Sequence, residues 1–334
     1  MTAAPAPPES WGEELVGRRR RTAPQAPVAP GGGRAPGRRA GPAGPTASAV
    51  PAESRGDEAP EGLDWLYARV YCAGDDTDVL LPGLGEWLTG LRSRLELRSA
   101  HFLRYIDQRG HHLRVRLQGE PACLDEAAVE LDALDGIARR AQAGRAERLV
   151  PDTIPVALTG RPGLSLALYG PEYAKYGGVE GVERAERHFD LSSRWCLAHR
   201  VWTWPRPQGR VALAAHLLAL VAVRGQVPAQ EMLAAHLRAW GARLPAGMRA
   251  QDELIGLVTG VVEQCERQAE DLSALDELAG DAVRTTERIG VGVGARRVVD
   301  LVHMDVNRLG VSPAEECVAG LAARHLVGTG VLRR

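Results

Sequence analysis

The sequence predicts an α+β fold, in which a small, mainly antiparallel sheet from the first half packs against helices from the second half. Two observations carry this prediction. Between residues 63 and 170, short runs of apolar residues alternate with polar ones, and a hairpin is centred on Gly110. From Val179 onward, nearly every segment has apolar residues three or four positions apart. A period of two is typical of half-buried strands, and a period near 3.6 is typical of amphipathic helices.

The fold is expected to begin near Leu63, after a tail formed by residues 1–60. The tail is crowded with proline, alanine, glycine and arginine, and it has little apolar material to stabilise an ordered backbone. Such a composition predicts disorder. Seven arginines and no acid occur between Gly17 and Val50, which indicates either a solvated tail or an attraction for an acidic partner. Residues 63–330 are expected to form one domain.

The individual elements follow from these periodicities. Strands are predicted at 65–72, at 101–107 with 112–117 as a hairpin, and at 164–170. Helices are predicted at 83–97 and 124–145, and then at 179–199, 210–223, 227–243, 252–275 and 295–308. The last helix begins at Ser312-Pro313-Ala314-Glu315, a capping box with proline at its first helical position.

Composition excludes several classes of protein. The net charge of the 334 residues is -1, so no nucleic-acid or membrane partner is expected. The apolar stretch VALAAHLLALVAV at 211–223 is too short to span a bilayer, and the start resembles no secretion signal. Five cysteines lie far apart without a CxxC or CxxH pair, which indicates reduced thiols and a cytoplasmic location. No metal or nucleotide motif occurs, since GVGVG at 290–294 lacks the strand–GxGxxG–helix context, so no cofactor is expected.

The segment HLRVRL at 112–117 is the first candidate for chemistry. If it is a strand, Leu113 and Val115 face the core, while His112, Arg114 and Arg116 share the other face. Adjacent cations on one face repel each other unless water or an anion screens them. The pattern therefore indicates either a solvated outer face or a floor that binds carboxylates through guanidinium groups.

The segment YGPEYAKYGG at 169–178 contains Lys175, the only lysine in the chain. Glu172 and Lys175 can meet only if this turn is helical, because they are three positions apart. The segment connects a predicted strand to a predicted helix, where functional groups are common. The alternative is an ordinary surface ion pair.

The segment LVHMDVNRLG at 301–310 contains Asn307, the only asparagine in the chain. On a helix, His303 and Asn307 are separated by four positions and share one face. A lone helical histidine is more often a packed or surface residue than a catalyst. Two residue types that occur once each, both in polar clusters, favour a functional role for the region.

Taken in order, these segments resemble the elimination domain of lantibiotic dehydratases, also known as the thiopeptide-type bacteriocin biosynthesis domain. The resemblance extends over about residues 63–330 and depends on WLYARVYC, FLRYID with HLRVRL, YxPExxKYGGxxGxxxAExxF and HMxxNRLG. It implies removal of glutamate from glutamylated serine or threonine of a precursor peptide, which leaves dehydroalanine or dehydrobutyrine. A related group with the same scaffold forms the pyridine ring of thiopeptides by a formal [4+2] cycloaddition between two dehydroalanines, with release of the leader peptide. Neither reaction uses a metal or organic cofactor.

The resemblance also implies roles for individual residues. The family's catalytic positions are matched by Arg114, Arg116, Glu172, Lys175 and His303. Neighbouring motif residues are expected to bind substrate: His112, Tyr169, Asn307 and Arg308. His303 is the candidate base, or the acid if the base lies elsewhere, and Lys175 the stabiliser of an enolate oxygen. Dehydratases commonly have arginine where this chain has Lys175. Lysine keeps the positive charge but lacks the two parallel N–H donors of a guanidinium group. This difference leaves the pyridine-forming reaction open.

Partners follow from the same resemblance. Full-length dehydratases fuse this domain to a larger glutamylation domain that uses glutamyl-tRNA, and this sequence resembles the free-standing form. We therefore expect a precursor peptide as substrate and a separate glutamyl-tRNA-dependent glutamylation protein as partner. A third interpretation is a non-catalytic scaffold that binds the precursor peptide.

Overall fold

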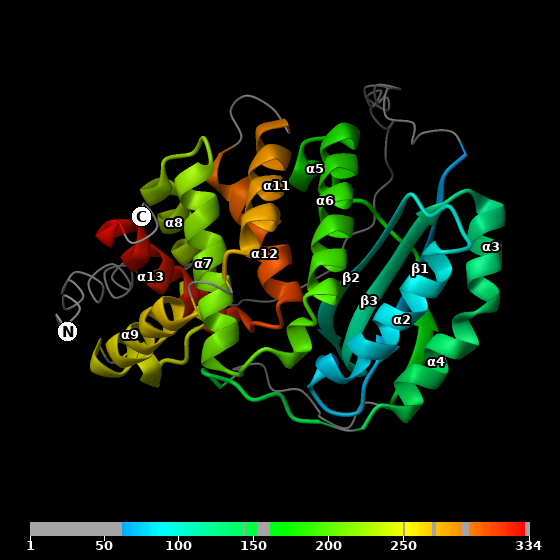
Figure 1. The fold of residues 1–334 in the computed structure, drawn as a ribbon, viewed down its shortest axis with the longest axis horizontal. Coiled ribbons are helices and arrows are strands. Elements are labelled where there is room, and N and C mark those ends of the chain that lie inside the picture. Colours follow the sequence, from blue (N-terminus) through cyan, green and yellow to red (C-terminus); the bar gives the residue numbers. More distant parts are fainter. Residues whose placement is uncertain are drawn as a thin grey trace, which may run out of the picture.

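The computed structural model describes residues 62–142, 144–151, 161–249, 251–268, 272–288 and 294–330. The tail expected at residues 1–60 and most of the GVGVG segment lie outside them. The described residues form the predicted α+β arrangement, with a sheet from the first half beside a group of helices from the second half (Figure 1). None of the described helices has both the length and the hydropathy needed to cross a membrane.

The sheet has the strand order β2-β3-β1-β4, and every neighbouring pair is antiparallel. Its strands are β1 (Asp64–Tyr71), β2 (Ser99–Asp107), β3 (Gly110–Gly119) and β4 (Gly163–Leu166). The predicted β2–β3 hairpin turns at Gln108 and Arg109, and Gly110, the predicted centre, begins β3 with a φ of 134° that favours glycine. The strand expected at 164–170 ends at Leu166, and Tyr169, Gly170 and Glu172 line a cavity instead.

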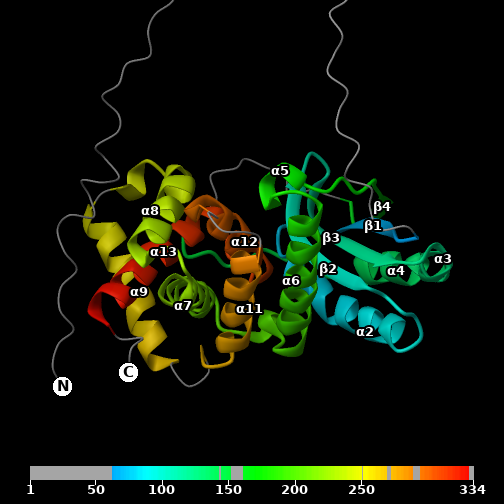
Figure 2. The same ribbon diagram turned by 90° about the horizontal axis from the view of Figure 1, so that it is seen from above.

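The sheet separates two layers of helices (Figure 2). One face carries Val70, Phe102 and Val115, all buried, and packs against the helices of the first half. These are α2 (Leu81–Arg92), α3 (Pro121–Val129) and α4 (Leu131–Arg140). The other face lies under α6 (Val179–Ala198) and α12 (Ala295–Arg308), which both contact β2.

The remaining helices form a bundle beyond α12. They are α7 (Gln208–Arg224), α8 (Ala229–Trp240), α9 (Gln251–Arg267), α11 (Leu275–Arg288) and α13 (Pro313–Thr329). The short helix α5 (Tyr173–Tyr176) instead lies beside α6 and α12. Short 3-10 turns occur at Thr77–Leu80, Val201–Thr203, Gly241–Arg243 and Gly247–Arg249. Helix α7 packs against α9, α11 and α13, and its residues 211–215 and 217–222 are buried. The long apolar stretch is therefore the centre of the bundle.

Two helix predictions need correction. The helix predicted at 124–145 is two helices, because the chain bends at Glu130, where φ is -92° and ψ is 5°. The helix predicted at 252–275 ends at Arg267, and the separate helix α11 was not predicted. Neither break contains a glycine or a proline. The helical spacing of apolar residues therefore predicted one continuous helix in each case. The predicted capping box is confirmed: Glu315 N–H donates to Ser312 Oγ (3.3 Å), and Ser312 N–H donates to Glu315 Oε2 (2.9 Å).

The outer edge of β2 is covered by side chains from α6. The N–H of Ala100 donates to Asp190 Oδ1 at 2.8 Å, and the N–H of Phe102 donates to Ser193 Oγ at 3.1 Å. An exposed strand edge presents unpaired backbone groups that can pair with another chain. These two bonds satisfy the edge and fix α6 against the sheet.

Helix α12 covers the next part of the same edge. Asn307 accepts from the N–H of Arg104 through Oδ1 (2.8 Å) and donates through Nδ2 to the carbonyl of Arg104 (3.0 Å). Arg308 Nε donates to the carbonyl of Phe102 at 2.9 Å. The Asn307 amide therefore forms the two hydrogen bonds that a neighbouring strand would form. It fixes α12 over the open face of the sheet, which is the face opposite α2, α3 and α4.

Candidate active site

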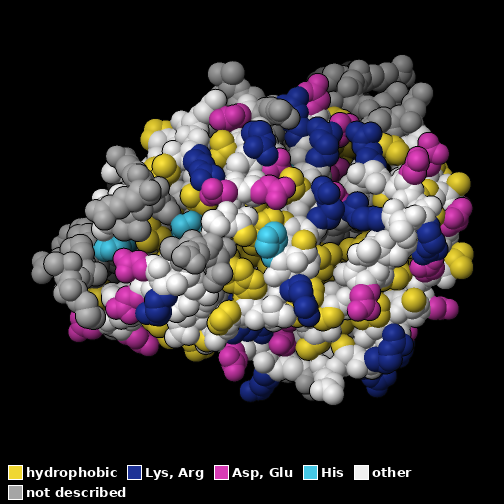
Figure 3. All heavy atoms as spheres, in the orientation of Figure 1, with side chains coloured by type: hydrophobic (Ala, Val, Ile, Leu, Met, Phe, Trp, Pro, Cys, Tyr) yellow, Lys and Arg dark blue, Asp and Glu magenta, His cyan; other side chains and the backbone are white. Residues whose placement is uncertain are grey.

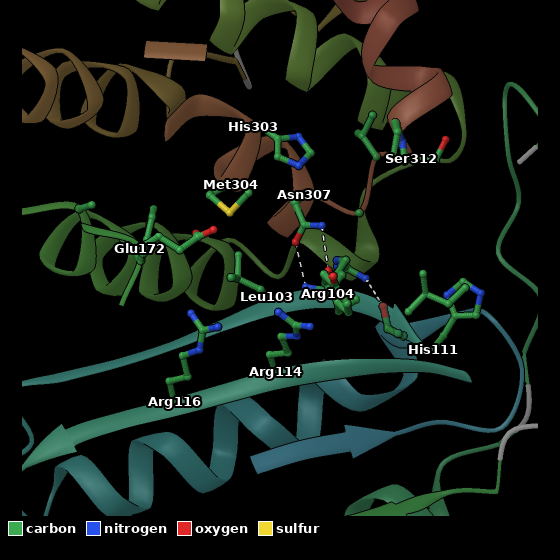
Figure 4. A pocket seen from close by; sticks show the side chains of 18 of the residues that line it. Leu103, Arg104, His111, Arg114, Arg116, Glu172, His303, Met304, Asn307 and Ser312 are labelled. Atoms are coloured by element: carbon green, nitrogen blue, oxygen red, sulfur yellow. Dashed lines mark hydrogen bonds between the residues drawn. The ribbon is translucent and has the colours of Figure 1, made fainter. Parts of the chain in front are cut away.

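A cavity of about 460 Å³ lies between the open face of the sheet and helices α5, α6 and α12. Lysine and arginine side chains gather on the surface over α6 and the strands, with acidic side chains among them (Figure 3). Arg114 and Arg116 extend from β3 toward the cavity, and His303 lies across from them (Figure 4). The cavity thus combines residues from both halves of the chain.

Arg114 and Arg116 form the floor of the cavity. They share one face of β3, as the period of two predicted. Each guanidinium lies over an aromatic ring: Arg114 Cζ is 3.2 Å from the centroid of Tyr105, and Arg116 Cζ is 4.5 Å from that of Tyr169. Both Nε atoms are buried without a hydrogen-bond partner, and neither side chain forms an ion pair with any described carboxylate. The face is not a solvated exterior, and two cations without counter-ions make it suited to binding an anion.

His112 departs from the prediction. Its ring is fully buried between Tyr71 and Tyr105, with ring centroids 4.6 Å and 5.7 Å away, and it does not line the cavity. Burial lowers the pKa of His112 to about 4, although the carbonyl of Gly110 and the charge of Asp107 act in the opposite direction. The residue is neutral near pH 7. It is therefore a core residue of the hairpin rather than a third cation of the floor.

Tyr169 lines the cavity beside Arg116 and donates its hydroxyl to Glu186 Oε1 at 2.5 Å. Glu186 comes from α6, lines the same cavity and is buried. Burial raises the pKa of Glu186 to about 7, although the Tyr169 hydrogen bond and the charge of Arg116 oppose that rise. The cavity wall therefore contains a carboxyl group that changes its charge near neutral pH.

Glu172 and Lys175 meet because the turn between them is helical, as their spacing required. Lys175 Nζ lies 3.3 Å from Glu172 Oε2 and 5.2 Å from the ring centroid of Tyr176. The Glu172 side chain is 63% exposed, whereas that of Lys175 is 25% exposed. The short helix ends at Gly177, whose φ of 86° requires the left-handed conformation. The single lysine of the chain thus lies at the wall of the cavity.

His303 lies across from the arginines, and its Nδ1 is 2.7 Å from Glu316 Oε2. The other carboxylate oxygen of Glu316 is 3.2 Å from Nε2 of His236. The indole ring of Trp240 stacks on the imidazole of His303 at a centroid distance of 4.1 Å and an angle of 27°. A second wall of the cavity therefore contains His303, whose Nδ1 is bound by the buried carboxylate of Glu316 on the side away from the cavity.

Two residues that were expected to bind substrate have structural roles. Asn307 lines the cavity, but its amide is used by the backbone of Arg104. Arg308 is fully buried, does not line the cavity, and donates to the carbonyls of Phe102 and Met304. Burial lowers the pKa of Arg308 to about 10, against the opposing charge of Asp305. Both side chains fix α12 to β2. Arg308 is not placed to reach a substrate in the cavity, whereas substrate contact by Asn307, which lines the cavity, stays a prediction.

The sequence did not single out Glu186, Glu316, His236 or Trp240. Glu186 belongs to the motif YxPExxKYGGxxGxxxAExxF and could have been found there as an acidic residue one helical turn before Phe189. Glu316 follows the capping box directly and had no signal of its own. No described group of three or more histidine, cysteine or acidic side chains is placed to hold a metal ion.

The arrangement can perform proton transfer next to a bound anion. Arg114 and Arg116 provide the positive floor, and Lys175 provides a further cation at the wall. His303 and Glu186 are groups that can accept or donate a proton, and both line the cavity. Such a set is suited to abstracting a weakly acidic proton while negative charge develops nearby.

Two solved structures illustrate the similarity of this fold to known proteins. One is the tRNA-dependent lantibiotic dehydratase MibB from Microbispora sp. 107891, at 23% identity and a TM-score of 0.52, covering 83% of this chain and 29% of the dehydratase. The other is TbtD, the pyridine synthase of thiomuracin biosynthesis, at 18% identity and a TM-score of 0.57, covering 80% of this chain and 99% of the synthase. No curated protein matches the chain. The chain thus spans about 29% of the length of the dehydratase.

The family comparison agrees with the resemblance seen in the sequence. The model of the family described as lantibiotic biosynthesis dehydratase C-term matches residues 65–327, which includes every strand and nearly all of the last helix. It also includes the floor of the cavity, with Arg114, and the wall that contains His303. The chain belongs to the lantibiotic dehydratase C-terminal family.

Proposed function

We propose that this protein removes glutamate from glutamylated serine or threonine residues of a precursor peptide. The observation that carries the proposal is that Arg114 and Arg116, which form no ion pair with any described carboxylate, face His303 across one cavity. A glutamyl ester carries a free side-chain carboxylate, which is the kind of anion that two guanidinium groups bind well. The ester also makes the serine oxygen part of a good leaving group.

The reaction needs a base because the Cα proton of a peptide is a weak acid. In the proposed mechanism, His303 takes the Cα proton, and the electron pair left on Cα is delocalised onto the peptide carbonyl as an enolate. Lys175 stabilises the developing charge on that oxygen, and Glu172 holds Lys175 in place. The electron pair then forms the Cα–Cβ double bond as the Cβ–O bond breaks. Glutamate leaves as a carboxylate, and His303 returns its proton to solvent.

The substrate must already carry glutamate. We propose that a separate glutamyl-tRNA-dependent protein glutamylates the peptide, in keeping with the tRNA-dependent dehydratase MibB, whose fold this chain shares. This partner would act before the protein described here. The precursor peptide, with leader and core segments, is then the shared substrate of both proteins.

A second candidate is the pyridine-forming cycloaddition between two dehydroalanines. The observation that favours it is the shared fold, which covers 99% of the pyridine synthase TbtD. Lys175 also departs from the arginine common in dehydratases. This reaction requires proton transfers for an iminol tautomer and for the loss of water and leader peptide, and the same cavity residues could supply them.

The test is an assay of the purified protein with two peptides. One carries glutamylated serine, and the other already carries two dehydroalanines. Conversion of the first to dehydroalanine with release of glutamate supports elimination, whereas conversion of only the second to a pyridine supports the cyclase. If the protein binds both peptides and converts neither, the proposal fails and a binding scaffold is the better description.

A further inference from the structure

We infer that Glu316 is a positioning residue that keeps Nδ1 of His303 protonated and thereby leaves Nε2 as a base for the cavity. The inference rests on the proposed function, since it assigns His303 one of its two possible roles. It also involves His236, which shares the same carboxylate from the opposite side.

The carboxylate of Glu316 lies between two imidazole rings on different helices. His303 on α12 approaches one oxygen at 2.7 Å, and His236 on α8 approaches the other at 3.2 Å. The Glu316 side chain is 1% exposed, and that of His236 is fully buried. Burial alone would raise the pKa of Glu316, but the two histidines lower it below its usual range. The group is therefore an ionised carboxylate.

An ionised carboxylate can only accept hydrogen bonds, so each ring nitrogen that faces it must carry a proton. His303 must then be protonated on Nδ1. In the neutral ring, the lone pair is left on Nε2, which makes no hydrogen bond to any described residue. Because His303 lines the cavity, that lone pair is available to a substrate proton.

Nε2 of His236 must also carry a proton, because it faces the same ionised carboxylate. Its Nδ1 is then an unprotonated nitrogen, and this atom is buried without a partner among the described residues. Gly320 faces this atom, and a Cβ at position 320 would lie 2.4 Å from it. The glycine lets the ring approach closely enough to reach Glu316. His236 thus occupies one oxygen and leaves the other for His303.

Two further contacts limit the movement of this array. The indole ring of Trp240 stacks on His303, which prevents the imidazole from rotating away. Glu316 lies in the first turn of α13, next to the capping box of Ser312 and Glu315. Glu315 Oε1 also accepts from the N–H of Leu149 at 2.6 Å, so the start of α13 is fixed to the rest of the fold.

The substitution Glu316→Gln discriminates positioning from simple packing. The amide has the size of the carboxylate but presents one acceptor and one donor to two ring nitrogens that are both donors. One ring must therefore change its tautomer or lose its bond. If His303 changes, Nδ1 accepts from the amide and Nε2 acquires the proton, which removes the base from the cavity.

The first measurement uses the unsubstituted protein. Histidines are labelled with ¹⁵N, and the resonances of His303 are assigned by their loss in His303→Gln. At a pH where the ring is neutral, we expect Nδ1 to be protonated and Nε2 to be unprotonated. The opposite tautomer would overturn the inference. This measurement requires no turnover, so it stands even if the protein converts neither peptide and the proposed function fails.

The second measurement compares Glu316→Gln with Asp281→Asn. Asp281 accepts from buried His188 at 2.8 Å and lies outside the cavity, so the control removes a similar carboxylate–histidine pair. We expect Glu316→Gln to shift His303 toward the Nε2–H tautomer and to lower kcat on the order of 10²–10⁴-fold, with KM nearly unchanged. Asp281→Asn should change neither. Wild-type tautomers of both His303 and His236, together with wild-type kcat, in folded Glu316→Gln would contradict a positioning role. If this variant does not fold, or if only His236 changes its tautomer, the tautomer of His303 in the unsubstituted protein decides.

Discussion

Arg114 and Arg116 differ from many arginines of this molecule, which pair with nearby carboxylates. Arg92, Arg206 and Arg210, for example, all bind aspartates. The two residues of β3 instead lie over aromatic rings and point into the cavity without a described counter-ion. Holding two unpaired cations together is unfavourable by itself. The arrangement becomes favourable when an anionic substrate occupies the cavity.

The substitutions Arg114→Ala and Arg116→Ala should therefore impair turnover while leaving the fold intact. Each removes charged hydrogen bonds to substrate worth about 1.5–3 kcal/mol, so kcat/KM should fall roughly 10- to 150-fold. Arg184→Ala is the matched control, because Arg184 pairs with Glu180 on the surface of α6. Steady-state kinetics and circular dichroism measure the two effects. If both cavity variants unfold while the control does not, these arginines are structural and the anion floor is wrong.

Glu186 should make the stability of the protein depend on pH in a recognisable way. Its folded pKa of about 7 is raised above the ordinary value of 4.5, so the folded state holds more protons than the unfolded state between these values. The free energy of unfolding should accordingly fall as pH rises from 4.5 to 7. Glu186→Gln keeps an acceptor for Tyr169 but does not titrate, and it should weaken this decline.

The measurement is denaturant unfolding at pH 4.5 and pH 7.5 for wild type, Glu186→Gln and Glu180→Gln. Glu180 lies on the same helix, and its side chain is 84% exposed, which makes it a suitable control. We expect the loss of stability between the two pH values to be smaller in Glu186→Gln alone. An equal loss in all three proteins would show that Glu186 does not titrate in this range.

The sequence could predict some of these residues and not others, for physical reasons. The alternation in HLRVRL shows on which side of a strand Arg114 and Arg116 lie, because side-chain direction in a strand is local. It could not show that His112 is enclosed by Tyr71 and Tyr105, which depends on neighbouring strands. Glu316 on α13 and His303 on α12 meet through a side-chain contact that forms only in the fold, and no spacing encodes that contact.

At the scale of elements, the edge of β2 explains why Asn307 is an asparagine. A side-chain amide offers a donor and an acceptor on neighbouring atoms, which suit the carbonyl and the N–H of one residue, and Asn307 does this for Arg104. The sequence drew attention to Asn307 as the only asparagine of the chain. The prediction for it was substrate binding and not this role, because Arg104 lies 203 positions away and no local pattern reveals the contact.

Asn307→Ala should destabilise the protein. It leaves the N–H and the carbonyl of Arg104 without partners, at a cost of about 1–3 kcal/mol. For a domain of this size, each kcal/mol lowers Tm by roughly 2–4 °C. Gln108→Ala, an exposed amide in the turn after β2, is the control and should leave Tm unchanged. Equal melting temperatures for both variants would contradict the edge-covering role, and differential scanning calorimetry measures them.

Helix boundaries were harder to predict than helix faces. The apolar faces of α6 and α12 follow the predicted periodicity, because burial of one face fixes it, whereas α7 is buried on nearly all sides. The bend at Glu130 and the separation of α9 from α11 have no breaking residue, and the packing of the surrounding elements determines them. The open face of the sheet is covered by helices from the other half of the chain, so the cavity itself could not be read from local pattern.

At the scale of the whole molecule, the matched family region begins at residue 65, next to the start of β1. The composition of residues 1–60 offers no apolar core, so their deletion should leave Tm unchanged within about 2 °C, less than the shift for 1 kcal/mol. Thermal denaturation of the truncated and full-length proteins measures this. A larger fall, or loss of cooperative unfolding, would show that the folded domain extends into this segment.

The cavity as a whole depends on both halves of the chain, with cations from the sheet side and the candidate base from α12. If this combination is the active site, the substitutions His303→Gln and Lys175→Ala should stop chemistry without stopping peptide binding. Losing the base costs on the order of 10²–10⁴ in rate, and losing a cation that stabilises the enolate costs on the order of 10²–10³. Lys175→Arg should restore much of the activity, because it retains the charge.

The most direct test is intact-mass spectrometry of a glutamylated precursor peptide incubated with each protein. We predict that wild type and Lys175→Arg release glutamate and form dehydroamino acids, while His303→Gln and Lys175→Ala bind the peptide but leave its glutamyl groups attached. Conversion of the peptide by His303→Gln at the wild-type rate would contradict the account.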